Sequence, residues 1–381
     1  MKKQNFELLT IDQSLFLLFC IIVVSVCINF KQPILSILIT PFIISIFINK
    51  WNLKQIIIVS LISLIYFLIY YFIKINATIS QLNYLLINKT NFYIVRIKAI
   101  NYINSIYNSE EVSGFFKLLI LNYKDSSNYV LYKQINNLSI GFLFVVSGFH
   151  INLILNVLKY IFRFKSQSWT WFVLSLLFCN VYGYFLGFSI GILRIILNIV
   201  IRKINKKLDS LKVSCLSGIL ISVIFLGQAS NFGFIMTYLC SIYINILTKH
   251  VKNKIILTLL INVGCFLIVL PIVLVMSHKL NIFSIFLNYV YSILIPPIYF
   301  WLLIFGWIPP LSTTNTLIIT NLLKLINLNI KTGTFLYVKS LKIGFVIGFY
   351  MFCSILLNIY LIKNNSRKII FFAPNSKNSV Y

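Results

Sequence analysis

The chain has 381 residues, of which 60% are hydrophobic and only 10% are charged, and its formal net charge is +27. Soluble domains keep about a quarter of their residues charged, so a soluble fold of this composition would expose most of its apolar surface. The composition excludes that class and predicts an all-α integral membrane protein: a polytopic bundle of about eight to ten transmembrane helices, with broken or re-entrant helices among them.

The basic excess, 33 Lys and Arg against 6 Asp and Glu, admits three explanations. Lys and Arg are enriched in the cytoplasmic loops of membrane proteins. A polyanionic partner, such as nucleic acid or anionic lipid, also favours a basic surface. Compositional drift in an AT-rich genome would raise Lys and Asn throughout the chain. Composition alone leaves the three explanations open.

The N-terminal part reads as a set of transmembrane helices over 1–74. Glu7 and Asp12 precede the first apolar run, so we interpret that run as a helix and not as a removed signal peptide. The next segment, 75–137, is polar and contains an amphipathic stretch near 112–123, and we expect it to form an external region. The three apolar runs of the N-terminal part cover 14–30, 33–49 and 55–74.

Channel-type helices are expected over 138–363, followed by a basic cytoplasmic tail over 364–381. The piece 190–201 is too short to span alone, and the amphipathic segment 312–340 either lies on the surface or re-enters. The candidate spans are 138–158, 168–190, 211–227, 232–248, 255–277, 282–307 and 341–363.

The charge of the loops predicts the orientation. The loop 202–212 carries five Lys and Arg residues, so we place it in the cytoplasm. Working backwards puts 75–137 outside and the N-terminus inside, provided that 168–201 enters and returns as a broken hairpin. The pair Pro296–Pro297 is a candidate break that would divide 282–307 into two half-helices.

Polar groups inside apolar runs are costly unless they face protein or water, and three sets stand out. The first combines small and amide side chains on one helix face with a Ser and a His nearby. This face fits either close helix packing or a functional polar surface. Its members are Gly141, Ser147, Gly148, His150, Asn152 and Asn156.

The second set repeats along one helix face as Gly187, Gly191, Arg194 and Asn198. Arg194 is a cation within an apolar segment, so it must extend to the interface, face a wet cavity or meet a transported anion. The third set is the evenly spaced stripe of Gly233, Thr237, Ser241 and Asn245, which is either a packing seam or a pore lining.

The inventory of reactive groups argues against catalysis. None of the six acidic residues lies in an apolar span, so a carboxylate metal site or a general-acid pair cannot be built there. Ser147 has His150 three residues on but no carboxylate to orient it. The sequence lacks a phosphate-binding GxxxxGK[ST] loop, and its seven cysteines form no CxxC pair. We therefore expect no enzyme activity, no metal and no cofactor.

Taken together, these segments resemble the ComEC competence family of DNA-uptake channels. The stretch Gly141–Ile151, with its Ser-Gly-x-His, is similar to that family's "SG-x-H" helix, and Phe144 stands where a first His is usual. Gly187-Phe188-Ser189 with Arg194 resembles the "GF-x-x-S-x-x-RA" segment, and 233–237 resembles "GFQLS". The resemblance covers about 115–300 and implies the membrane channel domain alone, without the C-terminal metallo-β-lactamase-like domain.

The resemblance implies a membrane channel for uptake of single-stranded DNA across the cytoplasmic membrane during natural transformation. It implies single-stranded DNA and membrane lipid as partners, with a DNA receptor and a separate cytoplasmic ATPase. A permease or flippase for a small or lipid-linked anion, with Arg194 as counter-ion, is the alternative, and a purely structural membrane protein is a third. The candidates for the DNA path are Ser147, Gly148, His150, Asn152, Gly187, Arg194, Asn198, Gly233, Thr237 and Ser241.

Overall fold

The computed structural model describes residues 91–144, 148–164, 168–225 and 232–337. It also describes six residues of the first apolar run, namely Ser14, Leu15, Leu17, Leu18, Ile21 and Ile22. Several predictions therefore lie outside the described residues: most of the N-terminal helices, the span 341–363, the tail 364–381 and Ser147.

Within the described range 91–144 the chain forms four helices before the Ser-Gly-x-His segment: α5 (Asn91–Ile106), α6 (Glu110–Leu121), α7 (Ser126–Asn137) and the short α8 (Gly141–Phe144). Residues 112–121 of α6 are all buried, and this helix packs against α16 and α17. The amphipathic stretch near 112–123 is therefore an interior helix of the protein. Whether 75–137 as a whole lies outside the hydrocarbon stays a prediction.

The next group of helices contains α9 (Gly148–Ile161), α10 (Trp169–Leu186), α11 (Ile190–Ile204) and α12 (Ser210–Ile224). The expected span 138–158 is thus divided between α8 and α9, with 145–147 outside the described residues. The segment 168–201 does form a hairpin, in which α10 and α11 pack against each other. Its turn uses left-handed backbone at Gly187 (φ 67°), which glycine adopts without steric cost.

The remaining elements are α14 (Phe232–His250), α15 (Lys254–Ser277), β1 (Lys279–Asn281), α16 (Ser284–Phe305), the 3₁₀ turn η2 (Pro309–Leu311), α17 (Ser312–Thr332) and β2 (Phe335–Tyr337). The amphipathic segment 312–340 therefore consists mostly of one helix. The two short strands pair antiparallel, with Lys279 opposite Tyr337, so the described part is not purely α-helical.

The predicted break at the proline pair is wrong, because α16 continues through both Pro296 and Pro297. Proline removes one backbone hydrogen bond and crowds the preceding turn. Within a helix bundle, neighbouring helices and small local adjustments can satisfy the freed carbonyl groups. α16 is also packed along much of its length, against α6, α8, α15 and α17.

Four described helices are long and apolar enough to cross a membrane: Trp169–Leu186, Phe232–His250, Lys254–Leu274 within α15, and Ser284–Phe305. This finding agrees with a helical membrane protein. The larger count of eight to ten spans stays a prediction. α11 has 15 residues and is about 22 Å long at 1.5 Å per residue, short of a bilayer core of about 30 Å.

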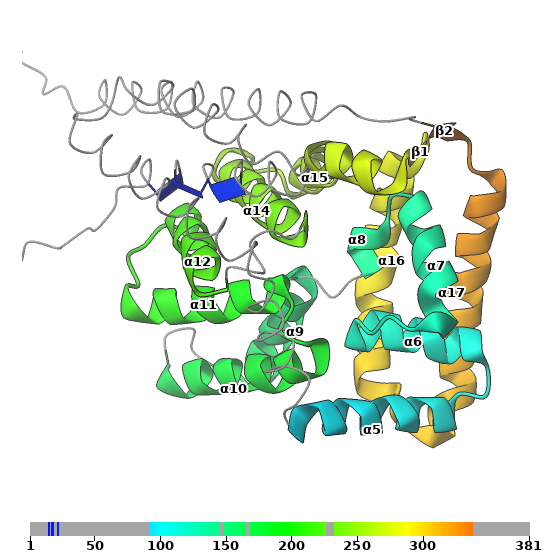
Figure 1. The fold of residues 1–381 in the computed structure, drawn as a ribbon. Coiled ribbons are helices and arrows are strands. Elements are labelled where there is room, and N and C mark those ends of the chain that lie inside the picture. The colour runs from blue at the N-terminus through cyan, green and yellow to red at the C-terminus, as the bar shows by residue number, and fades with distance from the viewer. Residues whose placement is uncertain are drawn as a thin grey trace, which may run out of the picture.

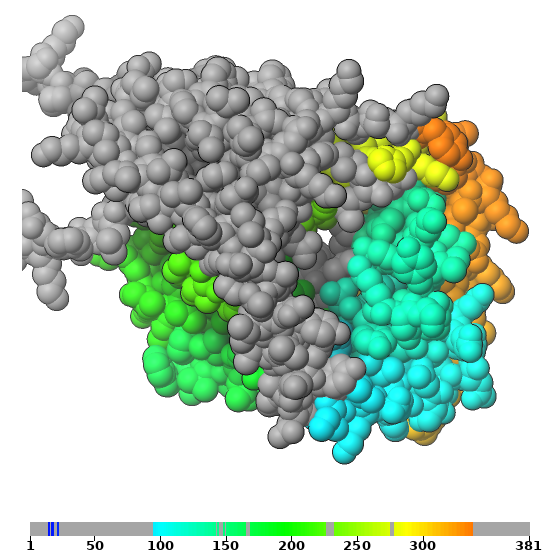
Figure 2. All heavy atoms as spheres, in the orientation of Figure 1, coloured from blue at the N-terminus to red at the C-terminus, as the bar shows by residue number. Residues whose placement is uncertain are grey.

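The described helices form two groups, which meet where α9 packs against α16 and where α15, next to α14, packs against α16 and α7 (Figure 1). In the first, α5 lies across the ends of α16 and α17, and hydrogen bonds fix it there: Tyr107 Oη donates to the Gly306 carbonyl at 2.8 Å, and Tyr102 Oη to the Trp307 carbonyl at 3.1 Å. The second contains α10, α11, α12, α14 and α15. Figure 2 shows α5 to α8 as one continuous surface bordered by α17, with α10 and α11 on the opposite side of the view.

Candidate functional site

The guanidinium of Arg194 lies where three helices converge. Arg194 belongs to α11, and its Nη1 donates a hydrogen bond to the backbone carbonyl of Thr237 on α14 at 3.1 Å. A Cβ atom added at Gly148, the first residue of α9, would overlap Nη2 of the same guanidinium. Gly148 thus provides the space that Arg194 occupies, and two of the sequence motifs meet at one side chain.

Polar atoms beside this junction are buried without partners. Among the described residues, Nε of Arg194 and Oδ1 of Asn198 have no hydrogen-bond partner. The two residues are one helical turn apart on α11, so their side chains share a face. A buried polar group left unsatisfied costs about 1–3 kcal/mol, and such groups commonly mark a site for water or a ligand.

Two of the described carboxylates are held in ion pairs with lysines. The described ion pairs are Lys117–Asp125 and Lys249–Asp209, and neither includes Arg194. The Arg194 charge therefore has a backbone carbonyl and the α9 backbone as its described neighbours, not an acidic side chain. An unpaired donor beside an unpaired acceptor suits an anionic group that also carries hydrogen-bond donors.

His150 belongs to a different cluster, in the buried centre of the molecule. Its side chain is 4% exposed, and its ring centroid lies 4.7 Å from that of Tyr299 on α16. The Tyr299 hydroxyl is 2.5 Å from the Tyr182 hydroxyl of α10, which donates to the Ile120 carbonyl of α6 at 2.9 Å. His150 therefore joins the α9 segment to the aromatic core between the two helix groups.

The polar stripe of α14 makes most of its described contacts with α12. Ser241 Oγ lies 3.2 Å from Ser214 Oγ, and Asn245 Nδ2 donates to Ser214 Oγ at 3.0 Å. A Cβ at Gly233 would meet only Ile190 Cδ1, at 3.7 Å. The geometry gives Ser241 and Asn245 a role in helix packing, while Thr237 reaches Arg194 through its carbonyl.

The predicted site residues thus fall into separate places. Gly148, Arg194 and the Thr237 backbone come together, with Asn198 one turn from Arg194 on α11, while Gly187 supplies the turn before α11. Asn152 and its neighbour Asn156 are exposed on α9. A Cβ at Gly141 would contact Asn136, whereas a Cβ at Gly148 would meet Arg194, and whether the two glycines share one helix face stays a prediction.

The sequence reasoning missed a buried ion pair between α6 and the start of α7. Lys117 of α6, with a side chain 4% exposed, pairs with Asp125 at 2.7 Å. Asp125 also accepts from Ser127 Oγ and from the Asn128 backbone, and so caps α7. The signal was the Asp-Ser-Ser-Asn stretch at 125–128, because Asp followed three residues later by Asn is typical of a reciprocal helix cap.

The surroundings of Asp125 change its pKa. Burial by itself would raise that pKa, but the hydrogen bonds from Lys117 and Ser127, with the positive charge of Lys117, outweigh burial and lower it below the ordinary value of 3.8. The carboxylate is therefore charged at neutral pH and holds the Lys117 ammonium inside the protein.

Comparison with known proteins identifies the family of this chain. A family model described as "Competence protein" matches residues 119–364. The chain belongs to the competence protein family. The match confirms the resemblance drawn from the motifs, and it includes every residue predicted for the DNA path.

Two curated relatives come from mycoplasmas. The chain is 28% identical over 208 residues to "Uncharacterized protein MG316" of Mycoplasma genitalium, covering 54% of this chain and 53% of the relative. It is 27% identical over 255 residues to the homolog of that protein in Mycoplasma pneumoniae, covering 64% of this chain and 67% of the relative. The chain thus spans about half the length of the first relative. No solved structure matches.

Proposed function

We propose that this competence-family chain is a membrane channel through which single-stranded DNA crosses the cytoplasmic membrane, without catalysis. The observation that carries the proposal is the pair of unpartnered atoms, Nε of Arg194 and Oδ1 of Asn198, on one face of α11. Arg194 would attract the phosphates of the DNA backbone. A guanidinium donates hydrogen bonds to phosphate oxygens, and no described carboxylate pairs with the positive charge of Arg194.

Gly148 acts in this proposal through Arg194. The guanidinium lies against the α9 backbone only because residue 148 has no side chain. A methyl group there would move Nη2 away and would disturb the bond from Nη1 to the Thr237 carbonyl. Gly148 is therefore a positioning residue, and its substitution should reproduce part of the effect of losing the charge.

The test compares DNA uptake and protein abundance in a competent host that carries variants of this gene. We expect Arg194→Ala to insert at a near-normal level and to reduce uptake strongly. Arg194→Lys should keep part of the activity, since the charge survives without the planar fork. Gly148→Ala should reduce uptake less than Arg194→Ala does, because the charge remains but is displaced.

Arg202→Ala is the matched control. Arg202 is on the same helix, is exposed, and bonds only to Ser210 Oγ at 2.9 Å among the described contacts. Its loss removes one positive charge near the end of α11 and should leave uptake unchanged. Normal uptake in an abundant Arg194→Ala variant would remove Arg194 from the proposed path.

The alternative is a permease or flippase for a small or lipid-linked anion. The same pair of atoms favours it, since one guanidinium beside one amide oxygen also fits a single anionic group that carries a hydrogen-bond donor. Deletion of the gene separates the two proposals. Lost transformation with DNA still bound at the cell surface supports the channel, and it leaves room for a separate receptor and ATPase. Unchanged transformation supports the permease.

A further inference from the structure

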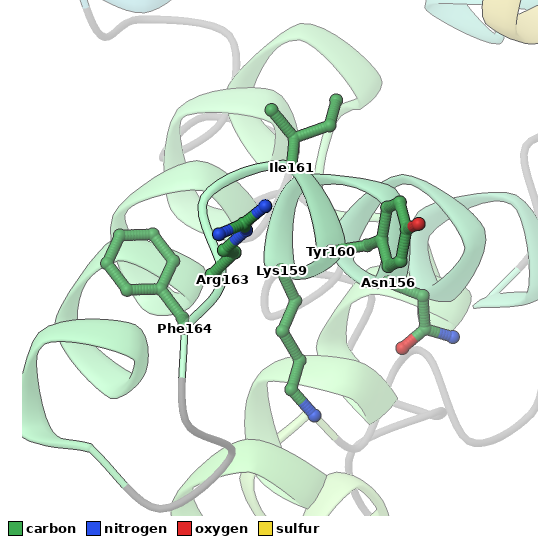
Figure 3. A pocket seen from close by; sticks show the side chains of 6 residues that line it. All are labelled: Asn156, Lys159, Tyr160, Ile161, Arg163 and Phe164. Carbon is green, nitrogen blue, oxygen red and sulfur yellow. The ribbon is translucent and has the colours of Figure 1, made fainter.

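A groove runs along the outer face of α9 and ends in a basic cavity. The cavity has a volume of about 610 Å³ and is lined by the last residues of α9 and the turn that follows. An adjoining hollow of about 420 Å³ continues along the helix and shares Asn156 and Tyr160 with it. Figure 3 shows the lining side chains, which are Asn156, Lys159, Tyr160, Ile161, Arg163 and Phe164.

The end of the groove is cationic. Lys159 and Arg163 both line the cavity, and none of its six described lining residues is acidic. The carboxyl end of a helix carries about half a negative charge, so it disfavours an anion. Two full positive charges at this place outweigh that partial charge. The cavity is therefore suited to an anionic group.

The backbone at Arg163 is also specialised. Its φ is 51°, the left-handed conformation that usually falls to Gly at the end of a helix. The Phe164 N–H closes the turn onto the Lys159 carbonyl at 3.1 Å. A non-glycine residue in this conformation is strained, because its Cβ lies too close to the following carbonyl oxygen. The chain thus carries a cation at a position where glycine would be more stable.

The surroundings of the cavity are apolar and aromatic, as at a membrane interface. Tyr160 is 86% exposed and Trp169 is 65% exposed, and Ile161 and Phe162 beside them are also largely exposed. In a water-filled passage so much apolar surface would be unfavourable. At the level of the lipid headgroups it is favourable, because aromatic side chains and Lys or Arg gather there.

The contacts of the cavity with neighbouring helices also place it at the level of the lipid headgroups. The Phe164 ring lies 5.7 Å from that of Trp171 near the start of α10. Lys203 Nζ, near the end of α11, lies 4.7 Å from the Trp169 ring. The cavity is therefore on the same side as the basic loop 202–212, which the charge rule places in the cytoplasm. That leaflet is the one that carries the negative surface potential.

We propose that this groove binds one anionic phospholipid, with its phosphate between Lys159 and Arg163. The Asn156 amide would donate to a glycerol ester carbonyl, and Leu153 and Val157 of the adjoining hollow would contact an acyl chain. This binding is independent of DNA passage, so either proposal can fail without the other. A nucleic acid strand is the competing occupant, and the apolar rim argues against it.

The test uses the full chain in phosphatidylcholine nanodiscs that contain brominated lipid, which quenches nearby tryptophans such as Trp169 and Trp171. We expect brominated phosphatidylglycerol to quench much more than brominated phosphatidylcholine at the same mole fraction. Removing each cation should lower the affinity for the anionic lipid roughly five-fold. Equal quenching by the two lipids would overturn the proposal.

The variants are chosen so that loss of binding cannot be mistaken for misfolding. Arg163→Gly removes the charge and relieves the left-handed backbone, so it should melt no lower than the parent. Lys159→Gln removes the second cation of the cavity. The matched control is Lys252→Gln with Lys254→Gln, two exposed cations at the turn into α15, which should keep the lipid selectivity. Competition by glycerol phosphate would show that the headgroup suffices, and competition by oligothymidylate alone would overturn the lipid assignment.

Discussion

Removing one partner of the buried ion pair Lys117–Asp125 should cost much more stability than removing the other. Asp125→Ala removes the cap of α7, worth about 1 kcal/mol. It also leaves the ammonium of Lys117, 4% exposed, without its carboxylate, and an unpaired buried charge costs about 3–5 kcal/mol. Ser127 Oγ, 3.2 Å from Lys117 Nζ, recovers part of this loss. We expect the free energy of unfolding to fall by about 3–5 kcal/mol.

Lys117→Met should cost much less. Asp125 is 23% exposed and keeps its bonds from Ser127 Oγ and the Asn128 N–H, so the loss should be about 1–2 kcal/mol. The double variant should be more stable than Asp125→Ala alone, because no charge is then left buried. Titration with SDS in mixed micelles, followed by tryptophan fluorescence, measures all three.

The pair Lys249–Asp209 is the control. Asp209 also precedes a helix, but its side chain makes no cap hydrogen bond, and the two side chains are 44% and 32% exposed. Asp209→Ala should cost less than about 1 kcal/mol. If the double variant at Lys117 and Asp125 loses the sum of the two single losses, the reasoning about an uncompensated buried charge is wrong.

Three further predictions follow from other parts of the structure. Because the folded pKa of Asp125 is lowered, the carboxylate stabilises the fold fully above the ordinary carboxyl pKa, and this contribution is lost as the pH falls below about 3.8. The difference in free energy of unfolding between the parent and Asp125→Asn should therefore shrink in acid, and a constant difference would contradict this. Tyr182→Phe should destabilise more than Tyr299→Phe, because Tyr182 also bonds the Ile120 carbonyl, and equal losses in the SDS titration would argue against that network. In a background without native cysteines, external thiol labelling should reach a Cys placed at Asn91 and not one at Lys206, and the reverse result would refute the orientation.

The sequence predicts features that a single segment determines. The hairpin 168–201 follows from the orientation that the loop charges predict, and Arg194 is conspicuous because charge is rare in apolar runs. The meeting of Arg194 with Gly148 could not be predicted, since periodicity assigns residues to a helix face but does not say which faces meet. The predicted break at Pro296 and Pro297 was wrong because the energetic cost of a proline inside a helix depends on what packs around that helix, here α16. The burial of α6 was missed for the same reason, since its partners α16 and α17 are distant in sequence.

The fastening of α16 and α17 at both ends has a mechanical consequence. The pairing of β1 with β2 ties the start of α16 to the segment after α17. Tyr102 of α5 and Tyr107, the residue after α5, hold the connection at the other end. This half should behave as a stiff frame that resists tilting of either helix. Any motion that separates the helices should then take place across α9, α11 and α14, where the guanidinium of Arg194 on α11 meets both α9 and α14.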